Sequence, residues 1–140
     1  MTGPTPSERR DGCPCGSGRP YNGCCGPFHA GAREPATAEQ LMRARYAAYV
    51  SRHEAFLLVT WYPQTRPARI QFDPDLRWTG LDILATSEGS AFHRQGTVEF
   101  IASYETRRRG RWTPGQLHEV SQFLMSDRWV YVDGAVGRRP

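Results

Sequence analysis

Four cysteines stand close together near the start of the chain, as Cys13-Pro-Cys15, then eight residues, then Cys24-Cys25. The surrounding residues 1–35 hold 13 of the 25 glycines and prolines of the chain, and few large apolar side chains besides the cysteines. Such a segment buries too little apolar surface to offset the conformational entropy that it loses on ordering. Its structure therefore depends on what the four thiols bind.

The spacing of the thiols favours a structural zinc ion. Zinc prefers four soft ligands in a tetrahedron, and two close pairs of cysteines supply them from two sides. The glycines between the pairs let the chain double back. Four thiolates fill the shell and leave no open position for catalysis. The predicted zinc ligands are Cys13, Cys15, Cys24 and Cys25.

Other uses of the thiols fit less well. A disulfide between the adjacent Cys24 and Cys25 closes only through a strained ring, and neither pair has the C-x-x-C spacing of redox motifs. An iron–sulfur cluster and a free-thiol role stay open as alternatives. His29 is an alternative to Cys25 as fourth ligand, because imidazole binds zinc equally well.

Length and charge exclude several classes of protein. The 140 residues give room for one ordinary domain and a small appendage. The longest largely apolar run, residues 55–62, is far shorter than the ~20 residues of a membrane span. The first ten residues lack the apolar stretch of a secretory signal, so we expect a cytoplasmic protein. The net charge of +4 falls by about two units when four thiolates hold one dication, which does not favour nucleic acid as a partner.

The rest of the chain changes from helical to strand periodicity. Thr37 and Gln40 have the spacing of a capping box before a helix over 38–51. A second helix over 53–62, ended by Pro63, and a loop over 64–75 follow. The predicted strands are 78–85, 97–105, 116–125 and 128–133, with a basic turn at 107–111. Helices followed by antiparallel hairpins predict an α+β fold with the helices on one face of the sheet.

Two family resemblances agree with this order. The pattern CPCGSG…Y…CC, from Cys13 to Gly26, resembles the SEC-C motif, the zinc-binding tail of the SecA translocation ATPase. The stretches TAEQLMRARYAAYV, TWYP, GTVEFIASY, LHEVSQF and WVYVDG are similar to the YchJ family of bacterial proteins, over about residues 13–134. This resemblance implies a SEC-C motif followed by a nuclear-transport-factor-2-like domain. Such a domain is cone-shaped, with N-terminal helices on a curved antiparallel sheet and a cavity at its open end.

The resemblance and the composition together give a division of the chain. The expected parts are a flexible tail at 1–12, a SEC-C motif at 13–29, a linker at 30–36, a nuclear-transport-factor-2-like domain at 37–134 and a flexible tail at 135–140. Because the motif offers little apolar surface, we expect it to unfold separately from the domain.

The expected cavity suggests a cluster of ionisable side chains. A register that places Glu99 opposite Glu119 brings two carboxylates together, and Arg45 from the first long helix is the expected cation between them. A register shifted by two residues would place Ser121 opposite Glu99 instead. Such a network is either a ligand-binding acid pair or a structural brace. The candidate pocket residues are Arg45, Tyr46, Trp61, Trp78, Glu99, Glu119 and Ser121.

These features lead to two hypotheses on function. The first is a binding or adaptor module with a structural zinc motif, which contacts a protein partner through that motif. The second is a small enzyme of hydrolase or isomerase type, which acts on a small-molecule ligand in the cone with Glu99 and Glu119. The basic residues Arg107, Arg108, Arg109 and Arg111 are interpreted as a solvated hairpin tip rather than an RNA contact.

Overall fold

The computed structural model describes residues 12–136. The expected tails at 1–12 and 135–140 fall outside this part, except for Gly12 and residues 135–136. The helices are η1 (Tyr21–Gly23), α2 (Gly26–His29), α3 (Ala38–Ser51) and α4 (Glu54–Val59), and the strands are β1 (Leu76–Glu88), β2 (Gln95–Arg108), β3 (Arg111–Met125) and β4 (Trp129–Val136). Within residues 12–136, no helix is long and apolar enough to cross a bilayer.

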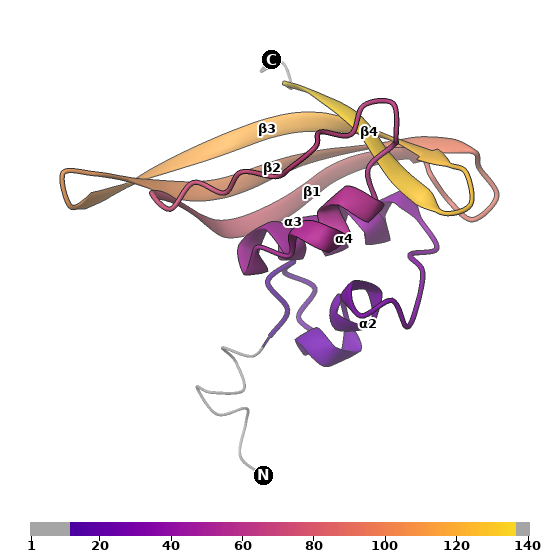
Figure 1. Cartoon of the computed structure of the whole chain (residues 1–140), viewed down its shortest axis with the longest axis horizontal. Helices are drawn as coiled ribbons and strands as arrows, with labels where there is room; N and C mark the ends of the chain where they lie inside the picture. The colour runs from indigo at the N-terminus through magenta and orange to yellow at the C-terminus, as the bar shows by residue number, and fades with distance from the viewer. Residues whose placement is uncertain (1–11, 137–140) are drawn as a thin grey trace, which may run out of the picture.

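The four strands form one antiparallel meander in the order β1-β2-β3-β4. β2 and β3 are joined by a two-residue turn, in which Arg109 and Gly110 have φ angles of 51° and 76°. Both are positive, as the tightest hairpin turns require. Helices α3 and α4 lie across one face of the sheet (Figure 1). The predicted α+β fold with helices on one face is therefore confirmed.

Helix α3 matches its predicted range of 38–51. The Thr37 hydroxyl accepts a hydrogen bond from the Gln40 N–H (3.1 Å), and the Gln40 side chain accepts one from the Ala36 N–H (2.7 Å). This resembles a capping box, except that the Gln40 side chain bonds the N–H one residue before the N-cap. The helix ends where Arg52 turns left-handed (φ 57°). Helix α3 is fully buried at Leu41, Ala44, Ala47 and Ala48.

The strands extend further than their apolar alternation indicated. β3 begins at Arg111 rather than at residue 116, because backbone pairing with β2 continues to the tip through residues 111–115, none of which is buried. α4 ends at Val59 rather than at residue 62. The Thr60 hydroxyl donates to Phe56 O (2.7 Å), and the Tyr62 N–H donates to Tyr131 O (2.7 Å), so the chain leaves the helix to meet β4.

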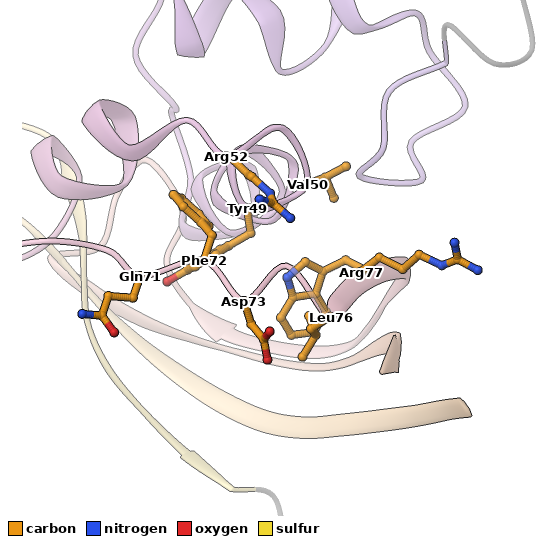
Figure 2. A pocket seen from close by; sticks show the side chains of 9 residues that line it. Tyr49, Val50, Arg52, Gln71, Phe72, Asp73, Leu76 and Arg77 are labelled. Atoms are coloured by element: carbon orange, nitrogen blue, oxygen red, sulfur yellow. The ribbon is translucent and has the colours of Figure 1, made fainter. Parts of the chain in front are cut away.

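The segment between α4 and β1 is an irregular loop, as predicted for 64–75. The Glu54 side chain accepts a hydrogen bond from the Ile70 N–H (2.8 Å). The Phe72 ring packs edge-on against Tyr49 of α3, with the ring centroids 6.3 Å apart (Figure 2). This packing places the loop beside the C-terminal end of α3.

Candidate metal centre and cavity

The four cysteines form one compact, buried group. Their exposed fractions are 0 to 8%, and their sulfur atoms all lie within 4.8 Å of one another. The sulfur of Cys24 lies 3.6 Å from that of Cys15 and 3.9 Å from that of Cys25. A tetrahedral ion with metal–sulfur bonds of about 2.3 Å separates its sulfur ligands by about 3.8 Å. The group therefore fits a four-coordinate metal site.

Tight local turns bring the two pairs of thiols together. After Cys15, the chain reverses through Gly16 and Gly18, whose φ angles of 83° and 85° suit glycine. The Cys13 N–H donates to Arg19 O (2.9 Å) and closes this turn. The second pair of cysteines lies between η1 and α2, directly opposite. The glycine-rich composition that prevents a core is what allows this reversal.

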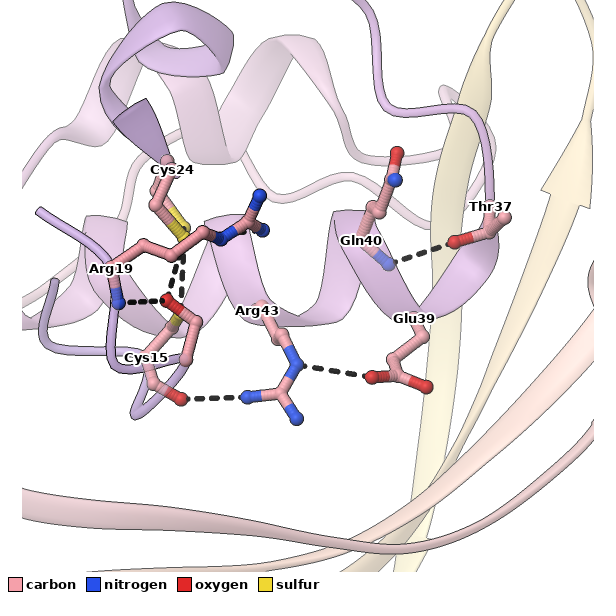
Figure 3. A network of polar contacts seen from close by, with 9 residues as sticks. Cys15, Arg19, Cys24, Thr37, Glu39, Gln40 and Arg43 are labelled. Carbon is pink, nitrogen blue, oxygen red and sulfur yellow. Dashed lines mark hydrogen bonds and ion pairs between the residues drawn. The ribbon is translucent and has the colours of Figure 1, made fainter. Parts of the chain in front are cut away.

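Polar groups stabilise negative charge at the sulfurs (Figure 3). The Ser17 hydroxyl lies 3.0 Å from Cys24 Sγ, in position to donate to a thiolate, and the Arg19 guanidinium lies 4.0 Å from the same atom. The hydrogen bond from the Cys25 thiol lowers the pKa of Cys15 to about 4, against the opposing effect of burial. This shift favours the thiolate form of Cys15, and metals bind thiolates rather than thiols.

His29 lies outside the sulfur group and does not replace Cys25. Its Nε2–H donates to Ala44 O in α3 (2.7 Å), so its Nδ1 accepts from the Tyr21 hydroxyl (2.6 Å). Burial lowers the pKa of His29, which favours the neutral ring that this pattern requires. His29 therefore connects the cysteine motif to α3.

Replacement of His29 tests this connecting role. We expect His29→Ala to keep the full metal content, because no ligand is lost, and to lower the free energy of unfolding by about 2 kcal/mol, because Ala44 O and the Tyr21 hydroxyl lose a buried partner. Urea unfolding with elemental analysis of the same samples measures both. Loss of one metal ion per chain in the variant would make His29 a ligand.

The motif packs against the rest of the chain. All four cysteines belong to the same buried cluster as Leu41 and Ala44 of α3. Arg43 of α3 donates to Cys15 O (2.9 Å) and also pairs with Glu39 (Figure 3). The segment expected as a linker is held too, since the Trp129 indole N–H donates to Ala36 O (3.1 Å). These contacts do not support separate unfolding of motif and domain, while the boundary at 30–36 stays a prediction.

A cavity of about 270 Å³ lies between α3 and the sheet. It contains five of the predicted pocket residues: Arg45, Tyr46, Trp78, Glu119 and Ser121. Its other lining residues are Met42, Tyr49, Phe100, Ala102, Leu117 and Tyr131. A neighbouring hollow of about 240 Å³ shares Tyr49 and Trp78 with it, and Arg52 and Arg77 also line this hollow (Figure 2).

Arg45 is the buried cation that the sequence analysis expected. Its side chain is 3% exposed, and its Nη1 donates to Leu57 O and to the Thr60 hydroxyl, both at 2.8 Å. Its guanidinium carbon lies 4.9 Å from the Trp61 ring centroid and 4.6 Å from that of Tyr131. Burial lowers the pKa of Arg45 to about 10, so the group remains charged at neutral pH. Trp61 therefore packs on Arg45 and does not line the cavity.

Glu99 does not join this group, which corrects the predicted acid pair. The register places Phe100 opposite Glu119, and Glu99 opposite Val120. The prediction was wrong by one residue, and a shift of one residue moves a side chain to the other face of the sheet. There the His118 Nε2–H donates to the Glu99 carboxylate (2.6 Å). The enzyme hypothesis with two facing carboxylates therefore loses its geometry.

We expect Glu99→Gln to change the free energy of unfolding by less than about 1 kcal/mol. The Glu99 side chain is 36% exposed, and ion pairs at partly exposed positions contribute little. Urea unfolding at pH 7 provides the measurement. A loss above 2 kcal/mol would place Glu99 in a buried network after all.

Glu119 and its neighbours form the polar end of the cavity. Burial raises the pKa of Glu119. A side chain at Gly134 would lie 2.9 Å from Glu119 Oε2, 3.2 Å from the Tyr131 hydroxyl and 3.4 Å from the Ser121 hydroxyl, so these three groups converge on one glycine. The sequence analysis missed Tyr49 and Tyr131, and only their positions facing inward on α3 and β4 would have indicated them.

The basic residues at the β2–β3 tip are partly paired. Arg107 bonds Asp75 (2.9 Å), and the guanidinium carbons of Arg77 and Arg107 lie 4.0 and 5.2 Å from the Trp112 ring centroid. These contacts stabilise the tip of the hairpin, in agreement with the interpretation as a solvated tip.

Comparisons with known proteins agree with this architecture. Residues 37–134 match the family described as "YchJ, middle NTF2-like domain". A UPF0225 protein of Streptomyces avermitilis is 54% identical over 132 residues, which cover 94% of this chain and 89% of that protein. The solution structure of a SEC-C motif containing protein from Rhodopseudomonas palustris has 36% identity and a TM-score of 0.76, and the match covers 90% of this chain and 98% of that one. The crystal structure of a sec-c motif containing protein from Psychrobacter arcticus, at 24% identity and a TM-score of 0.68, shares the fold over 96% of this chain and 87% of that one.

Proposed function

The chain belongs to the YchJ family, and on this premise we propose that it is a zinc-binding adaptor in which one structural zinc ion fixes an exposed loop for contact with a protein partner. The observation that carries the proposal is the buried group of four sulfurs at tetrahedral spacing. Four thiolates leave a tetrahedral ion no position for water or substrate, so the ion would hold structure rather than do chemistry. We place the protein in the cytoplasm, where thiols stay reduced.

The loop that encloses the sulfurs is the proposed contact surface. Its exposed residues are Gly16, Gly18, Arg19, Pro20, Asn22 and Gly23. Residues 12–33 contain Arg19 and Arg33 but no acidic residue. The backbone of this loop is held by the metal ligands on either side, so it would bind without a large loss of entropy. Zinc with four thiolates would offset both arginine charges, so we propose that the partner contacts the loop backbone and pairs an acidic side chain with the exposed Arg19.

The metal is tested first. Protein purified without added metal is expected to contain one zinc ion per chain, with all four thiols protected from a thiol reagent until a chelator is added. The control variant Ser17→Ala keeps all four ligands and should keep the zinc. Absence of zinc with four freely reacting thiols would contradict the proposal, and iron with acid-labile sulfide would replace it by an iron–sulfur centre.

The partner is tested with matched charge reversals. Arg19→Glu changes the proposed surface, while Arg111→Glu makes the same change at the β2–β3 tip. Both variants should keep zinc. A partner cross-linked to residues 16–23 in bacterial cells should be retained by Arg111→Glu and lost by Arg19→Glu. Equal retention by both variants would exclude this loop as the contact surface.

A further inference from the structure

The cavity beneath the sheet contains a buried cation without an anion. Arg45 is 3% exposed, and none of the ion pairs within residues 12–136 includes it. Its Nη1 donates to Leu57 O and to the Thr60 hydroxyl, and the Tyr49 hydroxyl also interacts with the guanidinium, so only part of its N–H donor set remains for an anion. A buried cation without a counter-ion is costly, so an anion in the cavity would be bound strongly.

Glu119 does not serve as that counter-ion. It lines the same cavity but lies beyond ion-pair distance of Arg45. Its Oε2 lies instead among the hydroxyls of Tyr131 and Ser121, around Gly134. Burial raises the pKa of Glu119, which weakens its repulsion of an anion, and the two hydroxyls can donate hydrogen bonds. The polar end of the cavity therefore offers a cation and hydrogen-bond donors.

The rest of the cavity is apolar and partly aromatic. Its walls are Met42, Tyr46, Trp78, Phe100, Ala102 and Leu117. The Tyr46 and Trp78 rings meet edge-on, with centroids 6.3 Å apart. The volume of about 270 Å³ equals that of about nine water molecules at ≈ 30 Å³ each. An occupant of roughly ten non-hydrogen atoms with an apolar body fits this space.

We propose that the cavity binds a small carboxylic acid with an apolar, ring-sized body. The carboxylate accepts hydrogen bonds from the remaining N–H groups of Arg45 and from the Ser121 and Tyr131 hydroxyls, which line the same cavity. The body lies against the Tyr46, Trp78 and Phe100 walls. The hollow that shares Tyr49 and Trp78 with the cavity is the route in, and Arg52 at its rim attracts anions (Figure 2).

The four tryptophans provide the readout. Trp78 lines the cavity, whereas Trp112 lies at the β2–β3 hairpin tip and is absent from the lining. Each indole N–H gives a separate signal in a nitrogen–proton correlation spectrum of the zinc-loaded full chain. Benzoate is expected to shift the Trp78 signal saturably and leave Trp112 in place. Benzamide, which has the same shape without the charge, should bind at least tenfold more weakly.

Inorganic phosphate tests the contribution of the apolar body of the ligand separately from that of its negative charge. It supplies an anion without an apolar body, so it should shift Trp78 at least tenfold more weakly than benzoate does. A saturable benzoate shift of Trp78 that exceeds both benzamide and phosphate supports the proposal. No saturable shift, or a shift matched by benzamide or by phosphate, overturns it.

Two variants locate the binding. Arg45→Met should weaken benzoate binding at least tenfold, while the matched Arg111→Met at the hairpin tip should not change it. Ala102→Leu places a larger side chain in the cavity and should abolish the Trp78 shift with the fold intact. Ala102→Leu keeps the proposal testable if Arg45→Met does not fold. Unchanged benzoate binding in Ala102→Leu would overturn it.

Discussion

Removal of the proposed zinc ion is expected to lower the Tm of the whole chain by at least about 10 °C. Cys15 and Cys25 are 0 and 1% exposed and belong to the core cluster that includes Leu41 of α3. Structural zinc contributes about 10–16 kcal/mol in zinc-finger peptides, which is comparable to the net stability of a whole domain. Loss of the ion therefore removes support from α3 as well as from the motif.

Thermal unfolding with and without a chelator, followed by near-ultraviolet circular dichroism, measures this effect. Trp129 reports on the sheet domain, because it is fully buried on β4. Cys15→Ser should reproduce the effect of chelation, and the exposed Asn22→Ala should leave the Tm unchanged. An unchanged transition of the sheet domain after chelation would show that the motif and the domain are separate folding units.

Arg45→Met is expected to lower the free energy of unfolding by about 3 kcal/mol. The variant leaves Leu57 O and the Thr60 hydroxyl without their donor, which costs about 1–3 kcal/mol for each buried group. It also removes the cation from the Trp61 and Tyr131 rings. Arg45 thus holds the end of α4 against α3 and β4.

Urea unfolding of the zinc-loaded protein measures this loss. Arg111→Met is the control, because Arg111 is exposed and the same substitution there should change stability by less than 0.5 kcal/mol. A loss below 1 kcal/mol for Arg45→Met would mean that the charge and hydrogen bonds of the guanidinium add little to stability. Arg45 would then stabilise the fold mainly through the packing of its aliphatic carbons.

The sequence was sufficient for features that depend on local chemistry. The cysteine spacing predicted the sulfur group, and the Thr37 and Gln40 pair predicted the start of α3. Alternation over residues 97–105 predicted a strand, and β2 contains this stretch. These signals depend on residues that are only a few positions apart in the sequence, so they can be recognised without the structure.

The pairing of strands was not available from the same signals. Alternation leaves the offset between two strands open, and the turn decides it. Glu99 opposite Glu119 would centre the turn on Arg109 alone, whereas the observed pair with Val120 centres it between Arg109 and Gly110. The two registers differ by half a residue in the centre of the turn. Because of this difference, Glu99 lies on the face of the sheet opposite to that of Glu119. The observed register needs a two-residue turn in which both residues have positive φ angles, and Arg109 and Gly110 adopt them. Attention to this turn would have favoured the observed register over the predicted one.

The position of the cysteine motif has a consequence for synthesis on the ribosome. All four sulfurs lie within 13 consecutive residues, so the site closes from local contacts alone. These residues leave the ribosome before α3, the helix on which the motif packs. A metal ion captured at that stage gives the emerging helix a rigid surface to dock on, before any strand of the sheet has been made. Metal supply during translation, rather than afterwards, would then set the yield of folded chains.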